Sequence, residues 1–305
     1  MSSGCVSISK SAFLPAAALP EATTARIDSK DGKSLVQQTL IKYSQNQAYC
    51  VLSTFDGALE NKEITVDTDK ENPLQLKLDR IAETKVNKSL LPVFVQFHHP
   101  LKQRSAESHI SDRSFEAVLG RFNLELKKNV TMDSFERLSS WRDEAGFVVS
   151  DRDRYELATF DTKALLKELM PADTPVTKYA ASDLEAVIDF DESVCGTKRA
   201  SLIAALAKHS EIYLIKTSAS VDGLLAAKGD RIVALYAETI ELAHALIKHY
   251  IAVKKLSKVT FFTRCGVWQT EPSTSRPVYR FHTRTIPSQL KWNKVYAANF
   301  GVHLV

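Results

Sequence analysis

The stretch RIVALYAETIELAHALIKHYI, residues 231–251, indicates the fold class more clearly than any other part of the chain. Its first residues, Arg231 to Tyr236, are mainly aliphatic and β-branched, which predicts a strand. Apolar residues then recur at intervals of three and four from Ile240 to Ile251, the spacing of an amphipathic helix. A strand that continues into a helix after a short turn is typical of an α/β protein.

The rest of the second half repeats these two patterns. Further strands are expected at 211–216, 221–229, 258–263 and 278–284, and further helices after Ser182-Asp183, after Thr197 and at 288–298. Together these elements predict a sheet with helices on both faces.

The first half carries weaker patterns of the same kind. Helices are expected at 35–43, 115–122 and 132–141, and strands at 48–52, 74–78, 92–97, 147–149 and 155–160. Pro171 and Pro175 then mark a boundary, and because a domain usually contains roughly 100 to 200 residues, the chain length favours two domains. We therefore expect one domain at 29–170 and a second at 175–305.

The first 28 residues are expected to form a disordered tail. They are rich in Ser, Ala and Thr, and their longest apolar run is interrupted by Pro15, unlike a secretory signal peptide. An organelle transit peptide is the alternative, although Lys10 is the only basic residue before Arg26. No segment approaches the roughly 20 apolar residues of a membrane helix. We therefore expect a cytoplasmic protein that does not bind membranes.

Charge and cysteine content exclude several other classes. Lys and Arg number 40 against 36 for Asp and Glu, and the resulting net charge of +4 is too small and dispersed to predict nucleic-acid binding. The four cysteines form no C-x-x-C pair, so neither a disulfide scaffold nor a zinc ribbon is encoded, and no metal site is expected.

Three segments of the second half resemble a known family. Residues 188–202, IDFDESVCGTKRASL, are similar to the opening of the second domain of YitH/HolE-type acetyltransferases, a branch of the GNAT N-acetyltransferase superfamily. Residues 235–243, LYAETIELA, and the tail from His282 to Val305 resemble later parts of that domain. In the first half, Asn123-Leu124, Met132 and Ala145-Gly-Phe147 are similar to the last third of a GNAT domain.

This resemblance implies two tandem GNAT-like α/β (α+β) domains, each a mixed, mainly antiparallel sheet flanked by helices. It also implies an N-acetyltransferase that transfers the acetyl group of acetyl-CoA to an amine of a small molecule or peptide. The first domain would hold acetyl-CoA, and the second would shape the site of the acceptor.

A GNAT domain holds the CoA pyrophosphate on backbone N–H groups of a glycine-containing loop between a strand and a helix. The corresponding segment follows His98 and precedes the helix at 115–122. The resemblance assigns acetyl-CoA binding to Gln103, Arg104, Ala106 and Ser108, with Ala106 and Ser108 in place of the two glycines. Glycine allows the closest approach of backbone to phosphate, so these replacements predict a weaker cradle.

The catalytic groups depart further from the family pattern. Trp141 stands where the family commonly has a tyrosine that protonates the CoA thiolate, and an indole N–H cannot serve as that acid. His98 is the candidate general base, because an imidazole titrates near neutrality. The alternative to an enzyme is a catalytically degenerate GNAT-derived binding or scaffold protein.

Two features near Cys195 have competing interpretations. Asp189, Asp191 and Glu192 form an acidic group that either receives a cationic amine or is a solvated helix end. Cys195 itself is interpreted as a structural residue, since a buried cysteine usually behaves as a small hydrophobic side chain.

Overall fold

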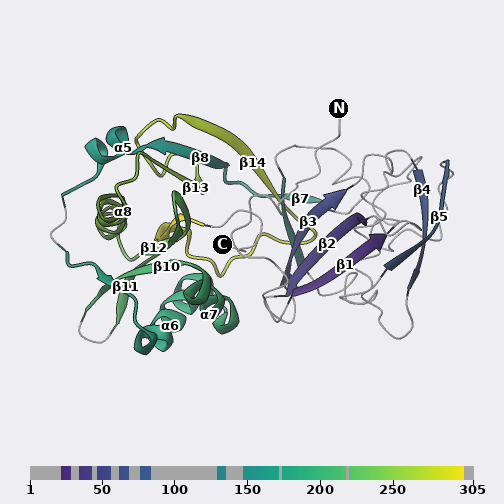
Figure 1. Ribbon diagram of the computed structural model, residues 1–305, viewed down its shortest axis with the longest axis horizontal. Coiled ribbons are helices and arrows are strands. Elements are labelled where there is room, and N and C mark those ends of the chain that lie inside the picture. Colours follow the sequence, from purple (N-terminus) through teal and green to yellow (C-terminus); the bar gives the residue numbers. More distant parts are fainter. Residues whose placement is uncertain are drawn as a thin grey trace. The chain divides into compact units, whose positions relative to one another are not determined.

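The computed structural model describes residues 22–28, 34–42, 47–55, 62–68, 76–83, 129–134, 147–171, 174–217 and 220–298 (Figure 1). The chain forms two compact units. Among the described residues, the first unit contains those up to Asp151 and also Tyr279–Ile286. The second contains Arg152–Val278 and residues 287–298. Both units are therefore built from more than one segment, and in the first unit these segments are distant in the sequence.

One strand in the sheet of the first unit comes from a segment that is distant in the sequence from the others. Its spatial order is β1 (Ala22–Asp28), β2 (Ser34–Lys42), β3 (Gln47–Phe55), β6 (Asn129–Ser134) and the second half of β14 (Thr274–His282), with β7 (Val149–Ser150) also paired to β14. All of these neighbours are antiparallel except β3 and β6, which are parallel. A separate antiparallel pair is formed by β4 (Lys62–Thr68) and β5 (Leu76–Glu83).

The sheet of the second unit is also mainly antiparallel. Its spatial order is the first half of β14, β8 (Tyr155–Asp161), β13 (Lys258–Arg264), β12 (Arg231–Ala237), β11 (Val221–Lys228), β10 (Glu211–Lys216) and β9 (Thr177–Lys178). A short strand, β15 (Val295–Ala297), pairs with β12 outside this order. The helical segments are α5 (Thr162–Glu168), a 3-10 turn at Ala181–Asp183, α6 (Leu184–Cys195), α7 (Ala200–His209), α8 (Ile240–Lys254) and a 3-10 turn at Trp292–Lys294.

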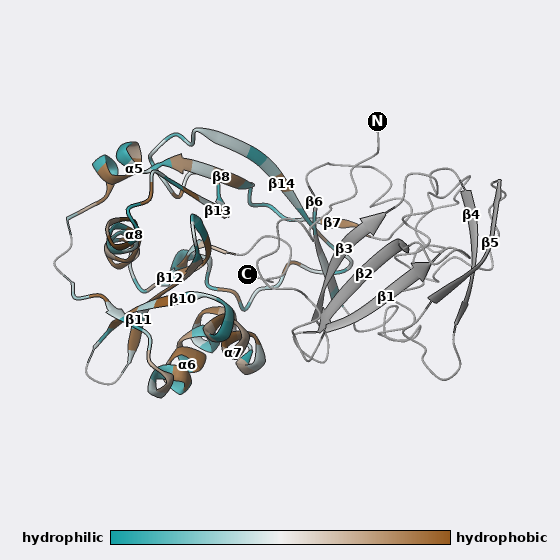
Figure 2. Cartoon of the chain, in the orientation of Figure 1, coloured by the Kyte–Doolittle hydropathy of each residue, from teal (hydrophilic) through white to brown (hydrophobic). Residues whose placement is uncertain are grey.

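Helices cover both faces of the central strands of the second unit. Figure 1 shows α6 and α7 on one side of β10 and β11 and α8 on the other. Because both faces are covered, these strands are buried along nearly their whole length, and Figure 2 shows them as mainly hydrophobic. By contrast, β14 is largely hydrophilic in the same view.

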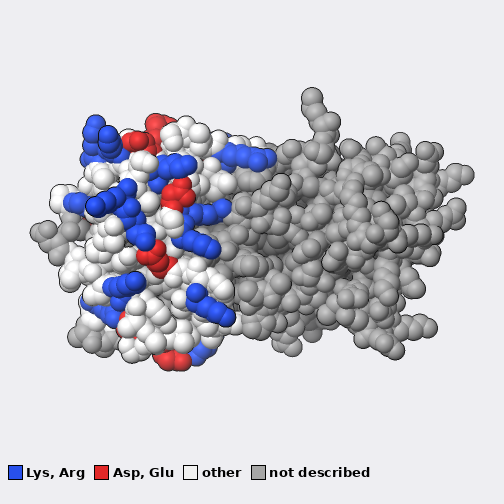
Figure 3. All heavy atoms as spheres, viewed as in Figure 1, with Lys and Arg blue, Asp and Glu red and all other residues white. Residues whose placement is uncertain are grey.

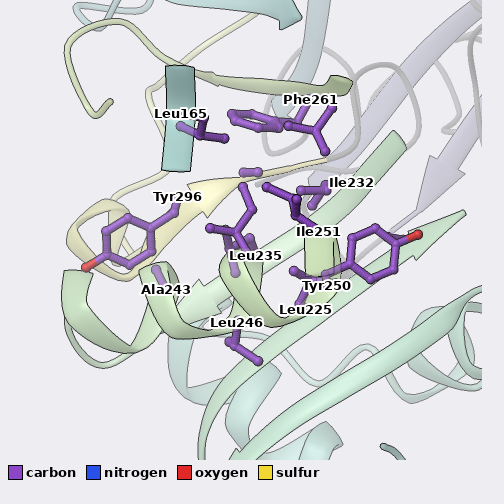
Figure 4. Packing of buried hydrophobic residues seen from close by; sticks show 14 of the residues in the cluster. Leu165, Leu225, Ile232, Leu235, Ala243, Leu246, Tyr250, Ile251, Phe261 and Tyr296 are labelled. Carbon is purple, nitrogen blue, oxygen red and sulfur yellow. The ribbon is translucent and has the colours of Figure 1, made fainter. Parts of the chain in front are cut away.

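The core of the second unit lies beneath α8. Figure 4 shows Leu246 and Tyr250 of this helix among buried side chains of β11, β12 and β13. The hydroxyl group of Tyr250 donates a hydrogen bond of 2.6 Å to the Gly229 carbonyl oxygen, so its polar end is also satisfied. The apolar residues at helical spacing in 240–251 therefore form the face of α8 that packs into the core, as the spacing predicts.

Most predictions for the second half are confirmed. Strands β10 to β13 and helices α6 and α8 lie where they were expected. The closing helix at 288–298 was wrong, because that segment contains only a 3-10 turn followed by β15. The backbone of β15 pairs with β12 and thereby satisfies groups that a helix would satisfy internally. The helix expected after Thr197 begins at Ala200, with Arg199 as its N-cap.

Predictions for the first half have a mixed outcome. Strands β3 and β8 are confirmed, and β5 begins at Leu76, within the strand expected at 74–78. The helix at 35–43 was wrong: β2 occupies that segment and pairs with strands along both edges, so tertiary pairing overrides its apolar spacing. The helix at 132–141 was wrong at its start, where β6 extends to Ser134, and its remainder lies outside the described residues.

Several other predicted elements fall on residues that the structure does not describe. The expected strand at 92–97 and helix at 115–122 are of this kind. Within the expected tail, β1 occupies Ala22–Asp28 and pairs with β2. The predicted domain limits remain a prediction; the two compact units divide between Asp151 and Arg152, and β8 and α5 precede Pro171 within the second unit.

Two glycines with positive φ provide a matched test of packing at the end of α6. Gly196 ends this helix with a φ of 73°, and an added Cβ would lie 2.6 Å from the Gln289 Cβ. Gly229 has a φ of 60° with no atom within 4 Å of an added Cβ. We expect Gly229→Ala to reduce the free energy of unfolding by about 1 kcal/mol through backbone strain alone. Gly196→Ala should reduce it by about 1–3 kcal/mol more, measured by urea denaturation, because of the added overlap. Equal losses would contradict the described contact.

Candidate functional site

The residues that the sequence assigned to acetyl-CoA binding and catalysis lie outside the described residues. They are His98, Gln103, Arg104, Ala106, Ser108 and Trp141. Their roles therefore remain predictions, and the polar clusters described below lie in the second unit and on β6, β7 and β14 of the first.

The turn between β12 and α8 is the place in the second unit where a strand leads into a helix N-terminus, the usual position of a phosphate cradle. Two carboxylates stand there. Glu238 pairs with Lys294, whose Nζ lies 2.6 Å from Oε1 and 2.5 Å from Oε2. Glu241 lies in the first turn of α8, and hydrogen bonds from Thr239 and from its own backbone N–H lower the pKa of its carboxyl group. This negative charge at the helix start opposes the binding of a phosphate.

Beside this turn, β12 and β13 are not paired with each other along most of their length, and β15 lies between them. These parallel strands share one residue pair, Arg231 with Thr260. Farther along β12, Leu235 and Tyr236 pair with β15 instead. On the opposite side, the Ala298 N–H donates a hydrogen bond of 2.9 Å to the Phe262 carbonyl oxygen. Thus β15 lies between the two strands and uses the hydrogen-bonding groups of both.

Side chains of β13 and the following turn hold β15 in this position. The Thr263 hydroxyl and the Trp268 indole N–H both donate to the Tyr296 carbonyl oxygen, at 2.8 Å and 3.2 Å. With β15 between the strands and two glutamates at the helix start, the second unit does not fit the pyrophosphate and thioester arm of acetyl-CoA at this turn.

A buried charged cluster lies at the end of α6. The Arg199 guanidinium donates to both carboxylate oxygens of Asp191, at 3.0 Å from Nε and 2.5 Å from Nη2, and Nη2 also lies 2.7 Å from the Cys195 Sγ. Although burial disfavours its charged form, the adjacent Asp191 holds the pKa of Arg199 well above its usual value. Burial raises the pKa of the Cys195 thiol, so this side chain stays protonated and unreactive.

The cluster excludes both interpretations of the acidic group for Asp191. Asp191 is fully buried and paired with Arg199, so it neither receives an external amine nor faces solvent. Asp189 and Glu192 are exposed on the same helix. The cluster fastens α6 to the start of α7, which is a structural role.

The first unit contains a second buried polar cluster, on one face of the pair β6 and β14. Arg280 and Asp133 lie directly opposite each other across these strands and form two hydrogen bonds of 2.8 Å. The exposed fractions of their side chains are 3% and 0%. A bidentate pair of this kind fixes both side chains while removing two charges from water.

The next pair along the same face is His282 and Thr131. The Thr131 hydroxyl lies 2.8 Å from the His282 Nδ1, and the Asp151 carboxylate lies 3.3 Å from Nε2. With a proton on Nε2, the ring would donate a hydrogen bond to the carboxylate, and Nδ1 would accept one from the Thr131 hydroxyl group. The result is a buried line of carboxylate, imidazole and hydroxyl groups contributed by three segments.

Asn129 completes this face at the end of β14. Its side-chain oxygen accepts from the Arg284 and Thr285 backbone N–H groups, at 3.1 Å and 3.3 Å, and its amide donates to the Thr285 carbonyl oxygen at 2.8 Å. Three alternate buried positions of β6, Asn129, Thr131 and Asp133, therefore hold the segment that follows Val278. The alternation of Asn129, Thr131 and Asp133 with Val130 and Met132 is a strand signal that the expected helix at 132–141 overlooked.

His244 is a buried titratable group of the second unit. Its Nδ1 accepts a hydrogen bond of 3.0 Å from the Met170 backbone N–H, and its ring stacks on Trp268. Burial lowers the pKa of His244. Since Nδ1 is already an acceptor, protonation would also remove the acceptor for Met170.

The described parts of the chain contain neither a metal-binding group of side chains nor a membrane-spanning helix. No group of three or more His, Cys, Asp and Glu side chains in these parts is arranged to hold a metal ion. No helix among the same residues is both long and apolar enough to span a membrane.

The chain was compared with protein families, curated proteins and solved structures. Residues 6–149, less than half of the chain, match a family model described as a domain of unknown function (DUF7596). No curated protein matches the sequence.

Among solved structures, a proposed acetyltransferase from Pyrococcus horikoshii has a TM-score of 0.51 at 13% identity, with 88% of this chain and 76% of that chain covered. A GCN5-related N-acetyltransferase from Sphaerobacter thermophilus has a TM-score of 0.42 at 12% identity, covering 87% and 82%. A tandem GNAT protein from the clavulanic acid biosynthesis pathway has a TM-score of 0.39 at 8% identity, covering 88% and 86%. The first of these likenesses shows a shared fold. The predicted fold class, a mixed, mainly antiparallel α/β sheet flanked by helices, is confirmed.

The buried pair in the first unit should be sensitive to the loss of one partner. We expect Arg280→Met to lower the free energy of unfolding by about 3–5 kcal/mol, because Asp133 would remain buried and charged. The double variant Asp133→Leu/Arg280→Met should be less destabilised than either single variant.

The control for this test is an exposed ion pair. Lys258 Nζ lies 3.6 Å from Asp230, with side-chain exposures of 64% and 44%. Lys258→Met should change stability by less than about 1 kcal/mol in the same denaturation experiment. A loss at Arg280 no larger than at Lys258 would show that the buried pair does not contribute.

His244 predicts a specific loss of stability in acid. Because its pKa is lower in the folded than in the unfolded protein, the unfolded state binds the proton more readily, and stability should fall as the pH drops below about 6.5. His244→Gln retains an acceptor but does not titrate, so the melting temperature of this variant should decline less between pH 7 and pH 5. Parallel declines in the two proteins would exclude His244 as a cause.

Proposed function

We propose that the chain is a GNAT-type N-acetyltransferase that transfers the acetyl group of acetyl-CoA to an amine. The observation that carries this proposal is the shared fold with a proposed acetyltransferase over 88% of the chain. The YitH/HolE-like segments at 188–202 and 235–243 support the same assignment for the second unit.

The first unit is the proposed site of acetyl-CoA. In the second unit, Glu238 lies in the turn before α8 and Glu241 in the first turn of the helix, and β15 lies between β12 and β13. The segment 103–108 contains one carboxylate, Glu107, and its Gln103 and Arg104 can donate hydrogen bonds to phosphate oxygens. We therefore assign one acetyl-CoA per chain, held by Gln103, Arg104, Ala106 and Ser108.

The proposed reaction is a direct transfer. The amine nitrogen attacks the thioester carbonyl carbon, the carbon–sulfur bond breaks, and CoA leaves as a thiolate that takes up a proton. His98 is the proposed acceptor of the proton that the amine loses, because its unperturbed pKa lies near neutrality. A backbone N–H of the central strand would polarise the carbonyl oxygen during the attack.

The acceptor is proposed to be a small-molecule or peptide amine in the cytoplasm, bound with the help of the second unit. Nucleic acid and membranes are not proposed as partners. On the visible face of the second unit, Figure 3 shows Lys and Arg separated by acidic and uncharged side chains instead of gathered in one continuous stripe. A polyanion-binding surface would concentrate one sign of charge.

A binding protein without turnover is the second candidate function. Two observations favour it: Ala106 and Ser108 replace glycines in the proposed cradle, and the corresponding turn of the second unit is closed by its own residues. On this view both units would be GNAT-derived scaffolds.

Calorimetric titration with acetyl-CoA tests the assignment of the site. We expect one binding site per chain, and Ala106→Gly/Ser108→Gly should strengthen binding by about tenfold, because backbone N–H groups could approach the phosphates more closely. Glu238→Gln/Glu241→Gln in the second unit is the matched control and should leave affinity and stoichiometry unchanged.

The outcomes separate the candidate functions. Unchanged affinity in the glycine variant would remove the loop assignment, and a second binding event in the glutamine variant would place a site in the second unit. Binding by the parent together with acetyl transfer that is lost in Ala106→Trp would support the enzyme. Absence of binding in every variant would support the scaffold.

A further inference from the structure

The second half of β14 belongs to the first unit, although the sequence on both sides of it belongs to the second. Tyr279–Ile286 belong to this unit, although the rest of the unit's described residues end at Asp151. The family model covers residues 6–149 and so includes β6 and part of β7 but not β14. The matched region therefore lacks a strand that the unit contains.

The backbone of β14 is paired along both of its edges in this unit. Residues 279–282 pair with 131–134 of β6 on one side, and Phe281 and His282 pair with Ser150 and Val149 of β7 on the other. The Asp151 N–H extends this ladder by a hydrogen bond of 2.9 Å to the Arg280 carbonyl oxygen. Without β14, the facing edges of β6 and β7 would lose these partners.

The side chains impose a sequence requirement on the strand between these edges. Asp133 needs a cation opposite it, and Arg280 meets that need with two hydrogen bonds. Two residues farther along the same face, His282 meets both Thr131 and Asp151. Because successive side chains of a strand point to opposite faces, a shift of one residue would bring Phe281 opposite a buried carboxylate. The edges therefore select an Arg-x-His strand in one register.

We propose that β6 and β7 form a strand-acceptor site whose ligand is an Arg-x-His β-strand, and that residues 6–149 are not a complete folding unit without it. In this chain the ligand is Tyr279–Ile286. When that segment is disabled, the site takes the same strand from a second copy of the sequence supplied in trans. This inference does not depend on acyl transfer.

The test uses the full-length chain with a disabled strand and a strand supplied as a peptide. In the variant Arg280→Ser/Phe281→Ser/His282→Ser, the chain's own segment no longer fits the site. The probe is a fluorescent peptide with the sequence of residues 274–287, TSRPVYRFHTRTIP. The control peptide has the residues of Arg280 and Phe281 exchanged, which keeps its composition and charge but moves the guanidinium to the other face.

We expect fluorescence polarisation to show binding of the native peptide to the triple variant, with the exchanged peptide on the order of 100-fold weaker. The unmodified chain should bind neither peptide, because its own strand fills the site. A folded triple variant that binds the two peptides equally, or binds neither, would overturn the proposal.

If the triple variant does not fold without the strand, a refolding measurement tests the same proposal. The variant is diluted from urea with either peptide, and near-UV circular dichroism reports tertiary packing. Recovery of the parent spectrum with the native peptide alone is the expected result. Recovery with both peptides, or with neither, contradicts a site that selects an Arg-x-His strand.

Discussion

The first unit depends on the ion pair between Asp133 and Arg280, two residues separated by 147 positions in the sequence. A buried carboxylate without a partner is strongly destabilising, so Asp133 makes the arrival of a particular distant segment a condition for a stable unit. We expect the pair to contribute specificity more than net stability, because burying two charges carries a desolvation penalty that an apolar pair would not have. His282 and Asn129 add further conditions on the register of the same segment.

The second unit meets its polar requirements locally. Glu241 binds the start of its own helix, Glu238 binds Lys294, and β15 satisfies strands β12 and β13 where they diverge. A strand that leads into a helix N-terminus leaves backbone groups that a ligand can satisfy, and here the chain's own residues satisfy them. In our proposal acetyl-CoA therefore binds to the first unit, while the second unit satisfies the groups at this turn with its own residues.

The sequence predicted those elements whose stability is local. Residues 231–251 have a long apolar periodicity, and both the strand and the helix follow it. Residues 35–43 also have helical spacing, but partners on both sides make them a strand. No local pattern could reveal β15, because its three residues are strand only through contacts with β12 and β13. The pairing of Asp133 with Arg280 was missed for the same reason, although the alternation around Thr131 was a signal of the strand itself.

Because β14 is shared between the two units, it also determines when the first unit can be completed during synthesis. A ribosome releases the chain from its N-terminus, and an N-terminal domain generally folds before the following one is complete. Here the first unit receives this strand only when residues 279–286 emerge, after the whole segment Arg152–Val278 of the second unit has been made. Until then the edges of β6 and β7 and the Asp133 carboxylate are without the partners that β14 supplies. The nascent protein must therefore keep the edges of β6 and β7 from pairing with other chains while residues 152–278 are made.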